Sequence, residues 1–481
     1  MALSGPANNA TSTWRRVRRW VAWLIGAPSA LLLLLFVAWL LSNLNDAAPQ
    51  PVPTALALPA PKVADERNAI YTLMGLFAAE DREPAQAGRE RWKTELAWAA
   101  APVVNGKRAD YPADPEVSQP ELKRISGPPW ECRAEGEACI AQWIAQKEAL
   151  AAQREQGRVW GTRCERLLDG HFEYEQLLPP KLDALSLSMA SVLPLVDCAR
   201  WFSTGAVLAW AGGDRTETLR QLQRADMLRV HFLDGSRTLA ASITALRVAR
   251  RVEDSFAAIA LRDAALAPQL ADLLSPLPDV REVAKRWIAT EAAFQRNFMM
   301  DLALELQGRD SGDGSWWARF TDAAADALSL QRFSIQIERT QQATNQLWLG
   351  NIARLGQPDL GASAQLPDIP GGRFLGWSWY NTTGQMLVDT SALGYGSYFA
   401  RHADAQLHHQ VVALTLAIQA QRIPANEREK WTQQQDIPDA LKQRLIWRDA
   451  GHQLAANPWT QAGSLARANS APDGIAVQWP H

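Results

Sequence analysis

The feature that most constrains this chain is an unbroken apolar run near its start, residues 20–41, WVAWLIGAPSALLLLLFVAWLL. A helix of this length spans about 33 Å at about 1.5 Å per residue, which is enough to cross a hydrocarbon core of about 30 Å. Trp20, Trp23 and Trp39 lie near its two ends, as in the aromatic belt of a membrane protein. The run therefore predicts a transmembrane helix.

A cleaved signal peptide is the alternative interpretation of this run. The apolar region of a signal peptide is about 7–15 residues long and is followed by small residues at a cleavage site. The run at 20–41 is longer, and the sequence SNLNDAA that follows offers no such site. We therefore expect an uncleaved signal anchor.

The distribution of basic residues predicts the orientation of the anchor. Arg15, Arg16, Arg18 and Arg19 precede the run, and the next basic residue is Lys62. Positive flanks stay in the cytoplasm, so we expect a cytoplasmic tail at 1–19 and the rest of the chain outside. Arginine and alanine are abundant, which is typical of a GC-rich bacterial genome. The expected location is the bacterial inner membrane, with a periplasmic ectodomain.

Residues 46–62 read DAAPQPVPTALALPAPK and contain five prolines. Such a segment cannot form a helix and favours extended polyproline II structure. It predicts a semi-rigid stalk over 42–64 that lifts the ectodomain away from the bilayer.

The remaining chain predicts a mainly α, irregular multi-helix ectodomain with little β structure. We expect two helical subdomains, 65–278 with all four cysteines and 279–481 with a long aromatic loop. In the second, Leu407, Val411, Leu414 and Ile418 form an apolar stripe at helical spacing. The best strand signals, RLIWRD and GIAVQW, predict a short C-terminal hairpin.

The cysteines Cys132, Cys139, Cys164 and Cys198 all fall in one short window. In an oxidising compartment an even, clustered set predicts disulfides, and three pairings are possible. We favour Cys132–Cys139, which closes a short loop, and Cys164–Cys198, which would tie two neighbouring helices. Buried free thiols are one alternative, and a zinc site is disfavoured because its thiolates come in closer pairs.

Glu291 is the candidate catalytic residue. It falls in an apolar stripe with Trp287 and Phe298, where an unpaired charge would be costly. We expect it to pair with an arginine of a neighbouring helix. The alternative is a catalytic acid, for which a raised pKa would be the signature.

Histidines and acidic clusters give no metal site. His402, His408 and His409 form the only histidine cluster, without a zinc-binding pattern, and we expect them to be solvated on the surface. Asp310 and Asp313 lack calcium-loop spacing and predict a turn. No cofactor is expected.

A long segment at 356–385 carries the candidate binding residues Phe374, Trp377, Trp379 and Tyr380. Exposed aromatic side chains could stack on sugars, enter a membrane interface or anchor a protein partner. The alternative is that they fill the core from a long loop.

Residues 381–418, from NTTGQMLVDTS through HADAQLHHQVVALTLAI, resemble a stretch of uncharacterised proteobacterial proteins. That resemblance implies a membrane-anchored helical protein and brings no function with it.

The functional expectation rests on elimination. The net charge of −2 argues against nucleic acid as a partner, and no hydrolase, nucleotide-binding or dinucleotide-binding motif occurs. We expect an envelope scaffold or adaptor whose partners are the inner-membrane bilayer and an envelope protein. The alternatives are a periplasmic glycan-processing enzyme using a buried carboxylate, and a module that binds lipid or a small apolar ligand.

Overall fold

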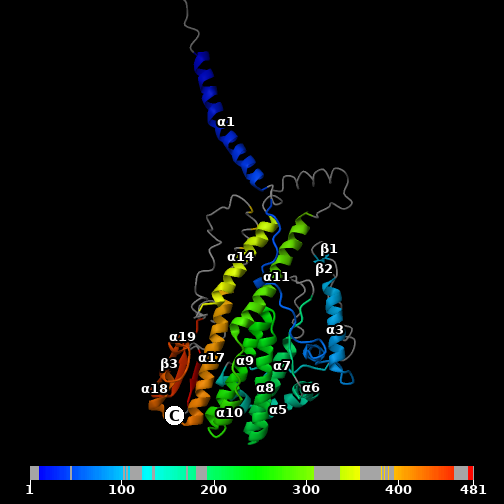
Figure 1. The fold of residues 1–481 in the computed structure, drawn as a ribbon, viewed down its shortest axis with the longest axis vertical. Coiled ribbons are helices and arrows are strands. Elements are labelled where there is room, and N and C mark those ends of the chain that lie inside the picture. Colours follow the sequence, from blue (N-terminus) through cyan, green and yellow to red (C-terminus); the bar gives the residue numbers. More distant parts are fainter. Residues whose placement is uncertain are drawn as a thin grey trace, which may run out of the picture. The chain divides into compact units, whose positions relative to one another are not determined.

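The computed structural model confirms a mainly helical protein with one apolar N-terminal helix and a small antiparallel sheet near the C-terminus (Figure 1). It describes residues 10–43, 46–100, 103–104, 107–108, 122–132, 136–169, 172–179, 192–307, 336–357, 381, 384, 388, 395–459 and 475–479.

The chain divides into two compact units. Unit 1 comprises residues 1–51, 299–344 and 370–391, and unit 2 comprises residues 52–298, 345–369 and 392–481. The helices that follow the N-terminal one are α2 (Ile70–Met74), α3 (Pro84–Ala99), α4 (Glu137–Ala145), α5 (Lys147–Gln156), α6 (Arg158–Leu168), α7 (Val192–Ala211), α8 (Arg215–Gly235), α9 (Leu239–Arg262), α10 (Ala267–Leu273), α11 (Val280–Gln307), α14 (Ile337–Leu355), α17 (Tyr395–Gln421), α18 (Arg428–Gln433) and α19 (Asp439–Lys442).

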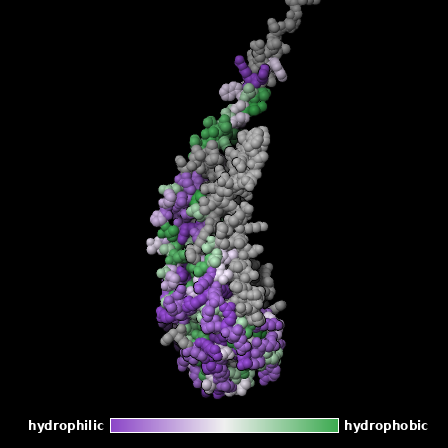
Figure 2. Space-filling model, turned by 90° about the vertical axis from the view of Figure 1, so that its right-hand side faces the viewer, coloured by the Kyte–Doolittle hydropathy of each residue, from purple (hydrophilic) through white to green (hydrophobic). Residues whose placement is uncertain are grey.

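Helix α1 (Ala10–Asn43) contains the apolar run and continues through Pro28. Its apolar side chains are exposed, with Trp23 at 74% and Leu34 at 67% of full exposure. Figure 2 shows hydrophobic side chains gathered along this helix beyond its arginine cluster. Among the described residues one other helix, α7, is long and apolar enough to cross a membrane, but 72% of its apolar window is buried inside the protein.

Local sequence signals set the boundaries of the central helices of unit 2. Gly213 adopts a positive φ of 81° and ends the turn after α7. The side chain of Asp214 accepts a hydrogen bond from the amide of Glu217 and caps α8, and Thr238 caps α9 in the same way. Figure 1 shows α7, α8, α9 and α17 as neighbours, and the contacts between them agree.

Unit 2 contains two hydrophobic core clusters. The first is built mainly from α2 and α4–α10, and the second from α11, α14, α17 and the C-terminal sheet. Both clusters lie in unit 2, and the division into subdomains 65–278 and 279–481 stays a prediction.

Helix α17 contributes to both core clusters. The predicted stripe Leu407–Val411–Leu414–Ile418 is buried in the second cluster, which confirms that part of the sequence prediction. A second face of the same helix, which carries Val412 and Leu416, is buried in the first cluster. Almost the whole circumference of α17 is therefore in contact with protein.

The C-terminal strands form a three-stranded sheet in the order β3 (Leu445–Arg448), β4 (Gln453–Ala456), β5 (Ile475–Gln478). All neighbours are antiparallel, and Leu454 of β4 pairs with Trp447 and Val477. The two expected strands are present, but they do not pair with each other because β4 lies between them. Its short QLAA sequence lacks the β-branched residues that signal a strand. Strands β1 (Val103–Val104) and β2 (Lys107–Arg108) form a separate antiparallel pair.

The expected stalk at 42–64 is not wholly solvated. Thr54–Leu56 form a short 3-10 helix, and Leu56 is fully buried in the second core cluster of unit 2. The prolines exclude an α-helix here, as predicted, but the segment packs against the helical unit instead of standing free of it.

Candidate functional site

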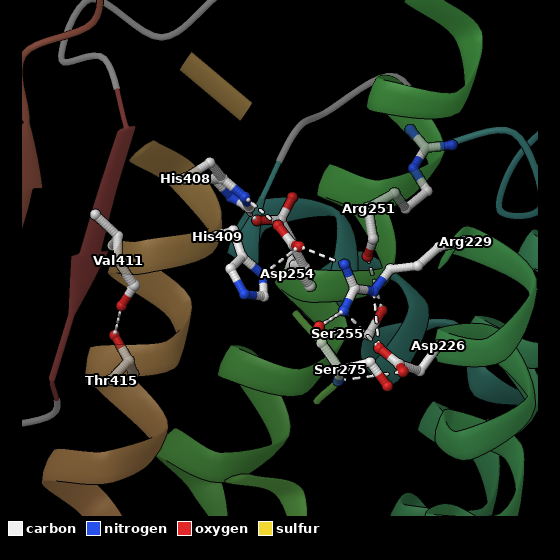
Figure 3. A network of polar contacts seen from close by, with 11 residues as sticks. Asp226, Arg229, Arg251, Asp254, Ser255, Ser275, His408, His409, Val411 and Thr415 are labelled. Atoms are coloured by element: carbon white, nitrogen blue, oxygen red, sulfur yellow. Dashed lines mark hydrogen bonds and ion pairs between the residues drawn. The ribbon is translucent and has the colours of Figure 1, made fainter. Parts of the chain in front are cut away.

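A cluster of buried charges joins α8, α9 and α17 inside unit 2 (Figure 3). Its centre is Glu253 of α9, whose side chain is only 1% exposed. One carboxylate oxygen, Oε1, accepts hydrogen bonds from Arg229 Nη1 at 2.9 Å and from His409 Nδ1 at 2.8 Å. The other, Oε2, accepts one from His408 Nδ1 at 2.8 Å. Three donors from two other helices thus converge on one carboxylate.

Arg229 extends the cluster toward the segment that follows α10. Its fully buried guanidinium donates from Nε to Asp226 Oδ1 at 2.8 Å, and it also donates to the carbonyl of Ser275. The amide of Ser275 donates back to Asp226 Oδ2 at 3.2 Å. Each of the three guanidinium nitrogens of Arg229 therefore donates to a protein acceptor, which offsets the cost of burying the charge.

His408 must be positively charged in this arrangement. Its Nδ1 lies 2.8 Å from Glu253 Oε2 and its Nε2 lies 2.9 Å from Asp254 Oδ1. Only the imidazolium has an N–H on both nitrogens to donate to two carboxylates. Burial alone would lower the pKa of His408, but the charge of Asp254 and the hydrogen bonds to both carboxylates outweigh it and raise the pKa to about 9.

Glu253 is correspondingly held as a carboxylate. Burial would raise its pKa, but the hydrogen bonds from His408 and His409 and the charge of Arg229 hold the pKa well below the ordinary range of a glutamate. Its two oxygens are occupied by protein donors, so the geometry suits a locked structural connection between helices. It does not present a free base to a substrate.

The histidines correct the sequence-based expectation of solvated side chains. His402 is 0% exposed and His408 is 5% exposed. The carbonyl of Tyr398 accepts the His402 Nδ1 proton, so Nε2 accepts from the Ser242 hydroxyl at 2.9 Å. Burial lowers the pKa of His402 to about 4, and it is neutral at physiological pH. The expectation failed because α17 is covered on two faces.

Glu291 accepts a hydrogen bond at Oε1 from the amide of Leu239, the first residue of α9, at 3.2 Å. In the described part of the chain Glu291 makes no ion pair with an arginine, so the expected pairing is wrong. The N-terminus of α9 is its partner instead. Burial raises the pKa of Glu291, and the Leu239 amide partly offsets this. Trp287 of the same stripe is fully buried, whereas Phe298 is 41% exposed.

Cys164 of α6 and Cys198 of α7 form a disulfide with their Cα atoms 5.5 Å apart, as the favoured pairing expected. The favoured bond between Cys132 and Cys139 is not formed, and both side chains are buried thiols. The Cys132 thiol donates to Gln142 Oε1 at 3.3 Å. Burial and a hydrogen bond with Cys132 raise the pKa of Cys139, which disfavours the thiolate needed for disulfide exchange.

The remaining sequence candidates lie outside the described residues. These are Phe374, Trp377, Trp379 and Tyr380 of the aromatic segment, together with Asp310 and Asp313. Their roles stay predictions. Within the described ranges, no group of three or more histidine, cysteine or acidic side chains has the arrangement needed to hold a metal ion.

Comparison of the chain with protein-family models, with curated protein sequences and with solved structures finds no match. The functional argument therefore rests on the chain's own residues.

Proposed function

We propose that this chain is a single-pass inner-membrane protein of a bacterium, with its N-terminus in the cytoplasm and its helical body in the periplasm. One observation carries the proposal: α1 is exposed over its apolar length, with Leu24 at 68% and Leu34 at 67% exposure. Exposed apolar surface of this extent is unfavourable in water and favourable in a bilayer. The arginines before the run and the Cys164–Cys198 disulfide support the orientation.

We further propose that the body acts as a scaffold or adaptor of the cell envelope. The support is the character of the polar groups in unit 2. Both oxygens of Glu253 and all three guanidinium nitrogens of Arg229 have protein partners, and Glu291 binds a helix terminus, as expected of groups that fix helix positions. The partners we expect are the bilayer itself and another envelope protein.

Chemical crosslinking in intact cells tests the scaffold proposal. The tagged full-length chain would be crosslinked, extracted from membranes in detergent and purified, and the captured proteins would be identified by mass spectrometry. We expect defined envelope proteins to be enriched at least several-fold over a control in which residues 1–45 anchor an unrelated helical protein. Recovery of lipids or glycans alone, with no protein above that control, would refute the adaptor function.

A further inference from the structure

The residues just after the membrane helix make specific long-range contacts. In unit 1, the carboxylate of Asp46 accepts the amide of Glu338 at 2.8 Å and the amide of Arg339 at 3.1 Å. These residues lie in the first turn of α14, where backbone amides have no acceptor within the helix. Asp46 therefore caps α14 from a position almost 300 residues away in sequence. Gln342 adds a hydrogen bond to the carbonyl of Ala48 at 3.1 Å.

Residues 56–63, the later part of the proline-rich segment, are bound within unit 2. The amides of Lys62 and Val63 donate to Glu175 Oε2 at 2.6 and 2.9 Å. Arg237 Nη2 donates to the carbonyl of Pro59 at 2.6 Å, and Leu56 is fully buried. The segment is thus attached at both of its ends.

The chain length between α1 and Asp46 limits how far the capped helix end can be from the membrane. Helix α1 ends at Asn43, so only three residue steps lead to Asp46, and they reach at most about 11 Å. From Leu41, where the apolar run ends, the reach is at most about 18 Å. The headgroup layer of one leaflet is about 5–8 Å thick.

We propose that the first turn of α14 is a membrane-facing surface, held against the lipid headgroups by Asp46. This inference rests on the proposed function, because it requires α1 to span the bilayer. The partner is the headgroup layer, which suits the partly exposed polar side chains of Glu338, Arg339 and Gln341. A free extended stalk over 46–62 could instead separate the body from the membrane by about 50 Å.

The test uses the full-length chain in nanodiscs whose lipids carry a nitroxide quencher on the headgroup. A small fluorophore is attached through Gln341→Cys, and labelling at that site alone is verified by mass spectrometry because Cys132 and Cys139 are also thiols. We expect the headgroup nitroxide to quench at least half of the fluorescence. Asp46→Ala removes the cap and leaves the hydrogen bond from Gln342 to the Ala48 carbonyl at this helix end, so α14 is held less firmly near α1 and quenching should fall at least twofold.

Asp214→Ala is the matched control, since it removes the side-chain cap of α8 without lengthening the connection to α1. It should leave the quenching unchanged. If the label is not quenched in the chain that keeps Asp46, and the chain remains embedded in nanodiscs, then the first turn of α14 does not face the membrane. The proposal that α1 is a membrane anchor would survive that result. Equal quenching with and without Asp46 would overturn its role in holding α14. Failure of the chain to stay in nanodiscs would refute the anchor, and this inference with it.

Discussion

Replacing Arg229 with methionine is expected to lower the free energy of unfolding by about 3–5 kcal/mol, since it removes one partner from a buried charge cluster. The guanidinium is fully buried and connects Asp226, Glu253 and the carbonyl of Ser275. Methionine fills much of the volume but donates no hydrogen bond, so buried Asp226 loses its cationic partner and buried Glu253 keeps only its two histidine donors. The change is measured by urea unfolding of the full-length chain in detergent micelles, followed by tryptophan fluorescence.

Arg215→Met is the matched control, because it makes the same substitution on the same helix. Arg215 pairs with Asp263 at 3.0 Å, but its side chain is 59% exposed. Exposed ion pairs contribute at most about 1 kcal/mol. If the two variants lost the same stability, the buried cluster would not have the structural role assigned to it.

Stability is expected to fall as the pH rises from 6.5 to above 9, because the pKa of His408 is about 9 in the folded protein and about 6.5 in an unfolded chain. The charged form is stabilised by folding, so its contribution is fully present below pH 6.5 and is lost through pH 9. The shift corresponds to a loss on the order of 3 kcal/mol. The melting temperature of the full-length chain in micelles, recorded between pH 6 and 10, measures it.

His408→Gln separates this effect from the titration of other groups. Glutamine can donate to one carboxylate but carries no charge, so the variant should be less stable at pH 6.5 and should lose little more by pH 9. The other groups facing His408 are Glu253 and Asp254, both acceptors. A wild-type melting temperature that does not change between pH 7 and 9.5, or a His408→Gln slope equal to the wild-type slope, would contradict a charged His408.

The sequence was sufficient to predict elements whose pattern is local. The apolar run at 20–41 has the length of the helix that forms there, and the stripe from Leu407 to Ile418 carries the periodicity of its helix. The pairing of Cys164 with Cys198 followed from the expectation that they lie on neighbouring helices. In each case the signal lies within one helix or one helix pair.

The buried charge cluster could not be predicted in the same way. The stripe from Leu407 to Ile418 predicts one buried face of α17, and the second apolar face, where Val412 and Leu416 follow His408 at helical spacing, was not used in the prediction. Glu253 is a usable signal in retrospect, because Val252 and Phe256 beside it are buried apolar residues. Its histidine partners come from α17, 155 and 156 positions away, so their convergence on Glu253 depends on the tertiary packing.

The proline-rich segment shows a similar limit. Composition determined that 46–62 would form no α-helix, because proline disfavours the helix interior and fixes φ, although Thr54–Leu56 form a short 3-10 helix. It did not determine whether the segment would be solvated. That depends on the Leu56 site in unit 2 and on Glu175, which binds Lys62 and Val63 from more than 110 positions away.

Protease accessibility on the two sides of the membrane tests the central claim most directly. The chain would carry a C-terminal tag and be expressed in bacterial cells, with membranes prepared as spheroplasts and as inverted vesicles. A body in the periplasm predicts that added protease removes the tag in spheroplasts and leaves it intact in inverted vesicles, while α1 stays in the carbonate-washed membrane. Protection in spheroplasts with digestion in inverted vesicles, or release of the chain by carbonate, would contradict the account.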